Sequence, residues 1–447
     1  MLLAIGLLAI DGGVASVGQD SVLLPQHPVH EPDSSGGKTF YLDPVHGSMS
    51  NSGRSPQQAW RTLEEVAAAN YFGYPIAAGD ELILMTGNHG NVRLHKIVNG
   101  SWLTIRAGAG QFPMIQSLRG EGIVHFRFEG LNFSPSFGSF YTDQNRGMCW
   151  IGTDDLGNWS RFIRILNCRF FSTTDTSSWG PSDWADLPST GLTVYSCSDV
   201  DIAGNAFFNV FRGVAANGRD IRIVANSIDK FSGDGIFAGG LVITVDGNLV
   251  TNCYDVSDFH NDGIQFYNGN LGSRWLTVSR NVVIADTSPD HHLSGHMQGI
   301  TNFDGGGAVD SVIANNLVIS NTQHGISFYS RNENCQFVNN SVYGFNSDGY
   351  GSPMRIYGHC RDTLVRNNLV TNLLADPITC TVDHNVVIFN AEYARLVFVD
   401  PARSDFDLKP GSLAIDSGSD VGAPAIDYRG TTRPQGLHVD VGAEEAH

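Results

Sequence analysis

One short phrase is written seven times between Thr190 and Tyr357. Each copy has a polar residue, then glycine, then an apolar residue at every second position, and the seventh copy is looser because Pro353 replaces the glycine. This alternation predicts a strand with one buried face. Its repetition at a roughly constant period indicates one supersecondary unit stacked on itself. The copies begin at Thr190, Arg212, Asp234, Asp262, Gln298, His324 and Ser352.

A second phrase, an apolar strand that ends in asparagine, keeps step with the first. Its step is 21 or 22 residues from Asn205 to Asn248 and widens to 33 and 35 residues up to Asn316. A coil of about 22 residues fits a parallel β-solenoid. Asparagines stacked at its turns can pass hydrogen bonds along the axis. The expected ladder contains Asn132, Asn167, Asn205, Asn226, Asn248, Asn281, Asn316, Asn340, Asn368 and Asn385.

Composition supports an all-β body and limits its partners. Charged residues make up only 16% of the chain, whereas glycine occurs 51 times. The net charge of −18 makes nucleic acid a poor partner, since phosphate binding needs a basic face. An anionic substrate must therefore meet a local cationic patch. The seven cysteines contain no C-x-x-C pair, which argues against a zinc site.

Three parts are expected along the chain. Residues 1–37 form an apolar segment and linker, residues 38–395 the solenoid with an N-terminal cap, and residues 396–447 a C-terminal cap. The apolar run at positions 1–10 has signal-peptide length but no positive start, and it is too short to span a bilayer. Such a segment suits attachment to a sister chain or a larger assembly. A helix at 60–69, capped by Thr62, would cover the N-terminal end of the stack.

The two ends carry a family resemblance. The opening Tyr41–Pro44 and the closing runs Ala414–Asp416, Asp427–Gly430 and Asp440–Ala443 resemble bacterial right-handed parallel β-helix proteins of the pectin-lyase-like superfamily. The resemblance covers about residues 38–445 and implies a single-stranded right-handed parallel β-helix. That superfamily contains polysaccharide lyases, polygalacturonase-type hydrolases, mannuronan C5-epimerases and non-catalytic spikes and adhesins. It also implies an extracellular, cell-surface or virion-associated protein, but fold alone does not choose among these activities.

Two local resemblances go further. Asn261–Gly263, Gln323–Ser327 and Met354–Tyr357 resemble polygalacturonase signatures in the same order. Met297–Gly299 stands where that family has a double aspartate, and Tyr357 stands where it has lysine, so the hydrolase mechanism does not carry over. Separately, Tyr254 with the Asp258-Phe259-His260 run resembles a motif of alginate C5-epimerases, with phenylalanine in place of the family's proline.

Alignment of the seven phrases places outward-facing residues in columns parallel to the solenoid axis. Neighbours in a column should lie about 4.8 Å apart, the strand spacing. Asp262, Gln298 and His324 are therefore expected side by side, with Gln265 and Arg355 nearby. Two inserts before the glycines add His260 and His296 above these columns. An aromatic file suited to sugar rings contains Tyr267, Phe303, Tyr329 and Tyr357.

These residues support three functions. On a uronate polymer, His260 or His324 would remove the C5 proton and Arg355 would neutralise the carboxylate. Gln265 and Gln298 would position the sugar, and Tyr267 or Tyr329 would act as the acid. On a neutral or sulfated glycan, Asp234 and Asp262 would act as paired carboxylates near the separation of about 5 Å found in retaining glycosidases. The third function is non-catalytic glycan binding.

No cofactor is required for any of these functions, and polysaccharide is the expected partner. Aspartates such as Asp255 and Asp258 leave a calcium site open. Structural alternatives stay open as well. Asp-Gly pairs form turns, so Asp234 and Asp262 could serve the backbone alone, and exposed aromatic stacks also stabilise sheets.

Overall fold

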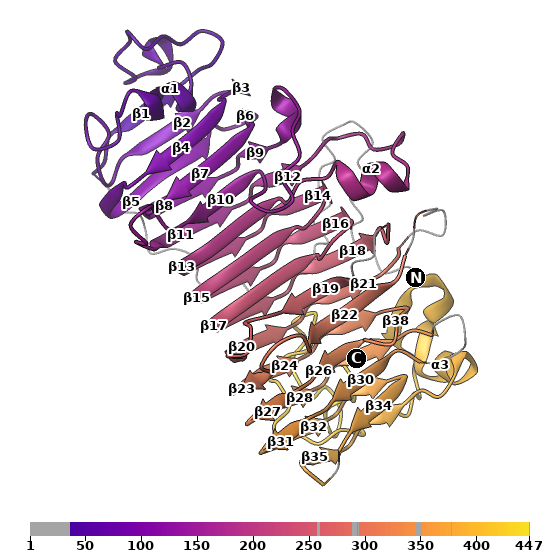
Figure 1. Ribbon diagram of the computed structural model, residues 1–447. Helices are drawn as coiled ribbons and strands as arrows, with labels where there is room; N and C mark the ends of the chain where they lie inside the picture. The colour runs from indigo at the N-terminus through magenta and orange to yellow at the C-terminus, as the bar shows by residue number, and fades with distance from the viewer. Residues whose placement is uncertain are drawn as a thin grey trace.

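The computed structural model describes residues 36–256, 260–287, 293, 295–345, 351–376 and 378–446. In these residues, parallel strands stack coil on coil into an elongated β-helix (Figure 1). The predicted parallel β-helix is confirmed. Of the predicted N-terminal segment, residues 1–37, all but 36 and 37 lie outside the described residues. Within the described part of the chain, no helix is long and apolar enough to cross a membrane.

The larger sheet wraps two faces of the solenoid and has 24 strands in the part of the chain that the structure describes. Its strands are β1 (Thr39–Leu42), β2 (Glu81–Leu84), β4 (Asn91–His95), β5 (Val98–Ala107), β7 (Ser117–Glu121), β8 (Val124–Glu129), β10 (Cys149–Gly152), β11 (Ser160–Leu166), β13 (Leu192–Ala203), β15 (Val214–Val224), β17 (Ile236–Asp246), β19 (Asn261–Phe266), β20 (Ser273–Ser279), β22 (Met297–Asn302), β23 (Ala308–Val309), β24 (Val312–Ala314), β26 (Ile326–Phe328), β27 (Arg331–Glu333), β28 (Gln336–Val338), β30 (Pro353–Ile356), β31 (His359–Arg361), β32 (Thr363–Arg366), β34 (Asn372–Ala375) and β35 (Cys380–Asp383).

A second parallel sheet closes the third face and holds 12 strands among the described residues. Its strands are β3 (Gly87–Asn88), β6 (Pro113–Ile115), β9 (Asn132–Phe133), β12 (Arg169–Phe171), β14 (Ala206–Val210), β16 (Ser227–Phe231), β18 (Leu249–Cys253), β21 (Val282–Ile284), β25 (Leu317–Ile319), β29 (Ser341–Tyr343), β33 (Leu369–Val370) and β36 (Val386–Val387). Side chains from both sheets meet in one continuous apolar core along the axis. Within it, Phe133, Phe170 and Phe207 stack with successive centroids 4.7 Å apart.

The repeated glycine faces the second sheet at close range. A Cβ atom added to Gly263 would lie 2.3 Å from Cγ1 of Val283 on β21, and real Cβ atoms do not approach that closely. Gly263 and the following Ile264 both face the core, whereas Asp262 and Gln265 lie on the outer side. The glycine phrase thus marks a close approach to the second sheet at or near the start of one strand of the larger sheet in each of these coils.

The asparagine ladder is present and structural. From Asn205 to Asn385, each side-chain Nδ2 donates to Oδ1 of the asparagine in the next coil at 2.9–3.0 Å. The same Oδ1 atoms also accept from a backbone N–H of the preceding coil. The prediction was wrong for Asn132 and Asn167. In the coil before Asn205, the ladder position is occupied by Cys168, whose backbone N–H donates to Asn205 Oδ1 at 2.8 Å. The preceding residue, Asn167, adopts a left-handed backbone conformation at φ 52°.

We expect Asn281→Ala to destabilise the fold by about 2–4 kcal/mol, because it removes the acceptor for two buried donors of Asn248. Those donors, the backbone N–H and Nδ2, bond to Asn281 Oδ1 at 3.0 and 2.9 Å. Denaturant unfolding followed by circular dichroism measures the effect. Asn91→Ala is the matched control, because it loses two side-chain hydrogen bonds, to Gln116 and Ser117, on the exposed side of β4. It should shift the midpoint less, since water can replace these bonds. Equal midpoints for both variants would show that the ladder does not stabilise the protein.

Short helices flank the coils. The α1 helix (Leu63–Ala68) lies at the N-terminal end of the stack (Figure 1), where its Leu63 and Val66 join the core. The oxygen of Thr62 accepts a hydrogen bond from Glu65 N at 3.2 Å, so the predicted cap is confirmed, although the helix is shorter than expected. The other short helices are η1 (Pro56–Gln58), η2 (Pro135–Phe137), α2 (Pro181–Asp186), α3 (Ala391–Val397) and η3 (Pro401–Arg403).

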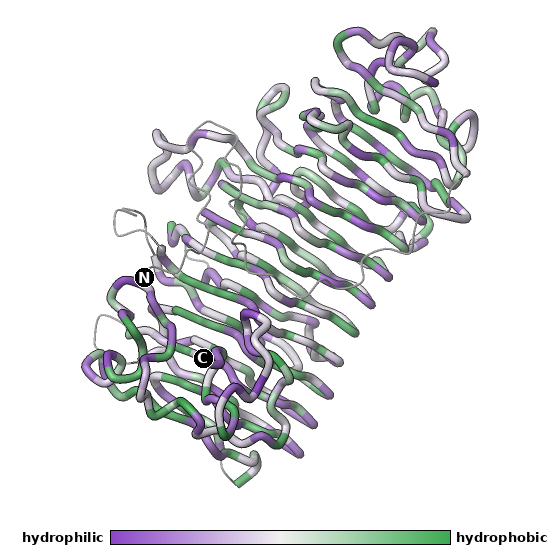
Figure 2. The backbone as a smooth tube through the Cα atoms, turned by 180° about the vertical axis from the view of Figure 1, so that it is seen from behind, coloured by the Kyte–Doolittle hydropathy of each residue, from purple (hydrophilic) through white to green (hydrophobic). Residues whose placement is uncertain are grey.

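The C-terminal region begins with α3, followed by the antiparallel pair β37 (Phe398–Asp400) and β38 (Asp405–Leu408). The predicted boundary at residue 396 falls inside α3. The following segment, residues 409–446, runs along the side of the last coils (Figures 1 and 2). We call this segment the tail. It bonds to asparagines of three successive coils, through Ile426 O to Asn315 Nδ2 at 2.7 Å, Asp440 O to Asn339 Nδ2 at 2.9 Å, and Gly442 N to Asn367 O at 2.8 Å.

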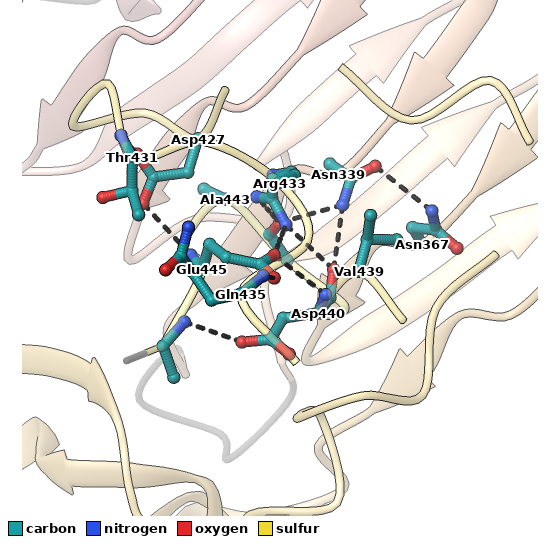
Figure 3. A network of polar contacts seen from close by, with 12 residues as sticks. Asn339, Asn367, Asp427, Thr431, Arg433, Gln435, Val439, Asp440, Ala443 and Glu445 are labelled. Atoms are coloured by element: carbon teal, nitrogen blue, oxygen red, sulfur yellow. Dashed lines mark hydrogen bonds and ion pairs between the residues drawn. The ribbon is translucent and has the colours of Figure 1, made fainter. Parts of the chain in front are cut away.

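A buried ion pair stands at the centre of the tail contacts (Figure 3). Arg433 Nη1 and Glu445 Oε2 lie 2.7 Å apart, and both side chains are 0% exposed. Arg433 Nη2 also donates to Gly442 O at 2.8 Å. Asp440 accepts from the backbone N–H of Ala446 at 2.7 Å. These contacts hold the tail together internally. Its bonds to Asn315, Asn339 and Asn367 and the apolar cluster that contains Leu317, Leu369 and Val441 attach it to the coils.

Candidate functional site

The predicted columns of the repeated phrase are present in the strand register. Asp262 of β19 pairs with Gln298 of β22, and the backbone N–H of Gly299 donates to His324 O of the next coil at 2.7 Å. The column two places after glycine runs Phe237, Gln265, Thr301, Ser327 and Arg355. We call the outer face of the strands in this register the strip. Asp262 and His324 thus lie on the same side of the solenoid, as predicted.

Asp262 is the centre of a polar cluster on the strip. Its Oδ1 accepts from Thr301 Oγ1 at 2.6 Å, and its Oδ2 lies 3.2 Å from His260 Nδ1. The other nitrogen of His260 is 3.5 Å from Asp304 Oδ2, which also accepts from Gln265 Nε2 at 3.0 Å. We call these five residues the central cluster. Asp262 is outside the apolar core but 0% exposed, because its neighbours on the strip cover it.

Burial and pairing raise the pKa values of two residues in the central cluster. Burial, assisted by the charge of Asp234, raises the pKa of Asp262 to about 6 against the opposing hydrogen bond of His260. The hydrogen bond to Asp262 raises the pKa of His260 to about 9. Between these values the two form an ion pair. The His260 side chain is 51% exposed, so the strip presents a cation to solvent at neutral pH.

Asp234 has both carboxylate oxygens occupied. Its Oδ2 accepts from Arg212 Nε at 2.8 Å, and its Oδ1 accepts from the backbone N–H of Asp262 at 3.3 Å. The side chain is only 5% exposed, and burial raises its pKa although Arg212 opposes the shift. Asp234 therefore holds β19 and Arg212 in place, which disfavours its use with Asp262 as a hydrolytic pair.

A second group of residues lies on the next coils. His324 Nδ1 is 3.1 Å from Ser327 Oγ. Burial, assisted by the charges of Arg355 and His260, lowers the pKa of His324 to about 4, so its imidazole is neutral at physiological pH. Arg355 Nη1 donates to Tyr329 OH at 3.3 Å. Two buried polar atoms here, Arg355 Nε and Gln298 Oε1, have no hydrogen-bond partner among the described residues.

The aromatic file connects the two groups. The Phe303 ring lies between the histidines, with centroids 6.0 Å from His260 and 4.9 Å from His324. Tyr329 follows at 5.4 Å from Phe303, and Tyr357 at 5.6 Å from Tyr329. Tyr267, also predicted for this file, forms a separate pair with the ring of Phe237 at 6.2 Å. Tyr267 and Tyr357 are 41% and 42% exposed, so this face offers rings to solvent.

Other predicted residues are not brought to the central cluster. His296 bonds to Asp255 at 3.2 Å, with its own side chain 75% exposed. Asp258 lies outside the described residues. Over the described ranges, no group of three or more His, Cys, Asp or Glu side chains could hold a metal ion. The calcium site at Asp255 and Asp258 stays a prediction.

Sequence reasoning missed several contributors to the site. Thr301 and Ser327 occupy the same column as Gln265 and Arg355, so the repeat carried their signal. Arg212 stands in the column before glycine, where its pairing with Asp234 could have been anticipated. Asp304 had no such signal, because it follows the end of β22 at Asn302, beyond the aligned positions.

Comparison with known proteins agrees with the fold. No family model and no curated protein sequence matches the chain. Among solved structures, a pectate lyase, Pel9A, aligns with a TM-score of 0.50 and 14% identity over 92% of this chain and 97% of its own. The chain shares the fold of the parallel β-helix proteins. The predicted resemblance to pectin-lyase-like proteins is confirmed at that level, and at this identity the likeness shows the fold alone.

More distant structural similarities also occur. XylC in complex with xylose aligns with a TM-score of 0.46 and 8% identity over 74% of this chain and 75% of its own. PfbA, a surface adhesin of Streptococcus pneumoniae, aligns with a TM-score of 0.39 and 9% identity over 68% of this chain and 86% of its own.

Proposed function

We propose that the strip binds an extracellular polysaccharide and that the residues around Phe303 remove the C5 proton of a uronate unit, as in lyase or epimerase chemistry. The observation that carries this proposal is the placement of His260, His324 and the Arg355–Tyr329 pair around one exposed aromatic file. Aromatic faces beside fixed polar groups suit sugar rings. Removal of a C5 proton needs a base, a group that neutralises the carboxylate and a proton donor.

The geometry and the charges divide these roles. His260 is protonated at neutral pH, so it would face the uronate carboxylate together with Arg355, whose Nε lacks a partner among the described residues. His324 is neutral and would accept the C5 proton. The Tyr329 hydroxyl would donate a proton to the leaving oxygen in elimination or to C5 in epimerisation. Gln298, with its free Oε1, would position a sugar hydroxyl.

Substrate binding would make His324 a better base. Its pKa is lowered first by burial and then by the charges of Arg355 and His260. A bound carboxylate would offset both charges, and a nearby anion favours the protonated imidazole. The pKa of His324 would therefore rise when the uronate is in place, toward the working pH where a general base is most effective.

The test is a panel of polygalacturonate, alginate and a neutral polymer such as arabinan, incubated in D2O. Ultraviolet absorbance reports the unsaturated product of elimination, and NMR reports deuterium at C5 for either lyase or epimerase chemistry. His46→Gln, whose side chain is 82% exposed near the N-terminal end, is the control variant. Saturated products with a new reducing end would favour hydrolysis instead. Binding of a polymer without product would leave a glycan-binding protein such as an adhesin.

A further inference from the structure

The strip repeats one combination of side chains along its length: an aromatic ring with a cationic group beside it. The rings and cations come from different coils, yet each set lies on the same outer face. The Cζ of Arg146 lies 5.6 Å from the Trp150 centroid, Arg212 Cζ 5.4 Å from Phe237, the His260 ring 6.0 Å from Phe303, and Arg355 Nη1 3.3 Å from Tyr329 OH.

The Arg146–Trp150 set lies in register with the central cluster. Trp150 of β10 pairs with Thr193, and the column continues through Ala215 and Phe237 to Gln265. These four steps of about 4.8 Å separate Trp150 from Gln265 by about 19 Å along the axis. On β10, Cys149 and Ile151 belong to the apolar core, whereas Trp150 does not. Trp150 therefore faces outward. A linear polymer that follows the strip would reach both places.

Local contacts hold this set in position. A Cβ atom on Gly152 would lie 2.4 Å from Cη2 of Trp150, so the glycine lets the indole lie flat along the strand. The loop that carries Arg146 is fastened to the strip by Thr190 Oγ1, which donates to Gln144 O at 2.7 Å, and by Thr193 Oγ1, which donates to Asn145 O at 3.3 Å. The ring is thus supported before a ligand arrives, which reduces the ordering cost of binding.

Charge indicates what this set would bind. The chain carries a net charge of −18, yet the exposed Arg146 side chain has no carboxylate partner among the described residues. We propose that Trp150 and Arg146 form a distal subsite for an acidic sugar unit of the same polymer that the central cluster binds. This inference rests on the proposed function and extends it, since it makes the substrate a linear anionic polysaccharide held along several coils.

The test measures binding by calorimetry on the His324→Gln variant, so that turnover does not interfere. Ligands are oligogalacturonates and oligoalginates of increasing length and a neutral oligosaccharide as comparison. On this background, Trp150→Ala and Arg146→Gln should each weaken binding of long acidic oligomers about five- to tenfold and leave the shortest ones unchanged. The matched control is Arg274→Gln, which breaks a similar set on β20, where Arg274 Cζ lies 4.6 Å from the Trp275 ring, off the strip.

Each outcome decides one of the two proposals. If long and short acidic oligomers bind equally well, or if Trp150→Ala weakens them equally, the distal subsite does not exist. If neutral oligomers bind as tightly as acidic ones, the assignment of an anionic polymer is wrong. If acidic oligomers bind with the expected length dependence but the unmodified protein forms no product, the subsite stands and only the catalytic proposal fails.

Discussion

Replacing Arg433 by methionine is expected to lower the free energy of unfolding by about 3–5 kcal/mol, because the substitution leaves Glu445 buried without a counter-charge. The two side chains are 2.7 Å apart and 0% exposed. Arg433 also donates to Asp440 O at 3.1 Å, so the substitution frees buried tail carbonyls as well. Denaturant unfolding followed by fluorescence and circular dichroism measures the loss.

A double variant separates the lost charge balance from the lost packing. Arg433→Met combined with Glu445→Leu removes both charges, and it should recover much of the stability, since an apolar replacement of a buried pair is often neutral. Arg61→Met breaks an exposed pair with Glu65 and should barely move the midpoint, because exposed pairs contribute little. An unfolding midpoint for Arg433→Met that matches the unmodified protein would mean that this pair does not stabilise the tail.

His324→Gln is expected to lower turnover of the uronate substrate by about 100-fold or more, with binding largely retained. Glutamine keeps a polar side chain of similar reach beside Ser327 but cannot accept the C5 proton. Steady-state rates and calorimetric affinity, measured on the same preparation, distinguish the two effects. Equal losses in rate and affinity would assign His324 to binding, and an unchanged rate would remove it from the chemistry.

The pH profile tests which histidine is the base. With His324 as base and His260 as cation, kcat/KM should fall above about pH 9, where His260 loses its proton. It should also fall below about pH 6, where Asp262 gains a proton, and further toward pH 4, where His324 does. With His260 as base, activity would instead rise as the pH approaches 9, because only then is its imidazole neutral.

The repeated phrase predicts much of the site because its glycine is tied to geometry. The space beside Val283 admits no side chain at Gly263, and the glycines of the other five copies that contain one face the second sheet in the same way. These six copies therefore share one backbone path, and the resulting register puts Asp262 beside Gln298 and Gln265 in line with Arg355. A pattern of one residue type therefore carried three-dimensional information across more than ninety residues of chain.

Other properties of the site were not predictable from the repeat. The repeat does not specify which side chains cover the outer columns, so the complete burial of Asp262 and the occupied oxygens of Asp234 appear only in the structure. Asp304 follows the end of β22 at Asn302, outside the repeated phrase, so the repeat does not predict its position. Asn167 shows a different limit, because a shift of one residue moved the ladder position to Cys168 while the sequence still offered an asparagine.

The tail has a consequence for how a protein of this kind can change length over evolution. A coil duplicated near Asn226 would meet neighbours of its own kind, with an asparagine above and below it. The coils of Asn315, Asn339 and Asn367 are each bonded to the tail, whose length is fixed. A coil gained or lost between them would leave at least one of these attachments without its partner. Natural variants should therefore differ in coil number in the first half of the solenoid and conserve the number of coils that the tail contacts.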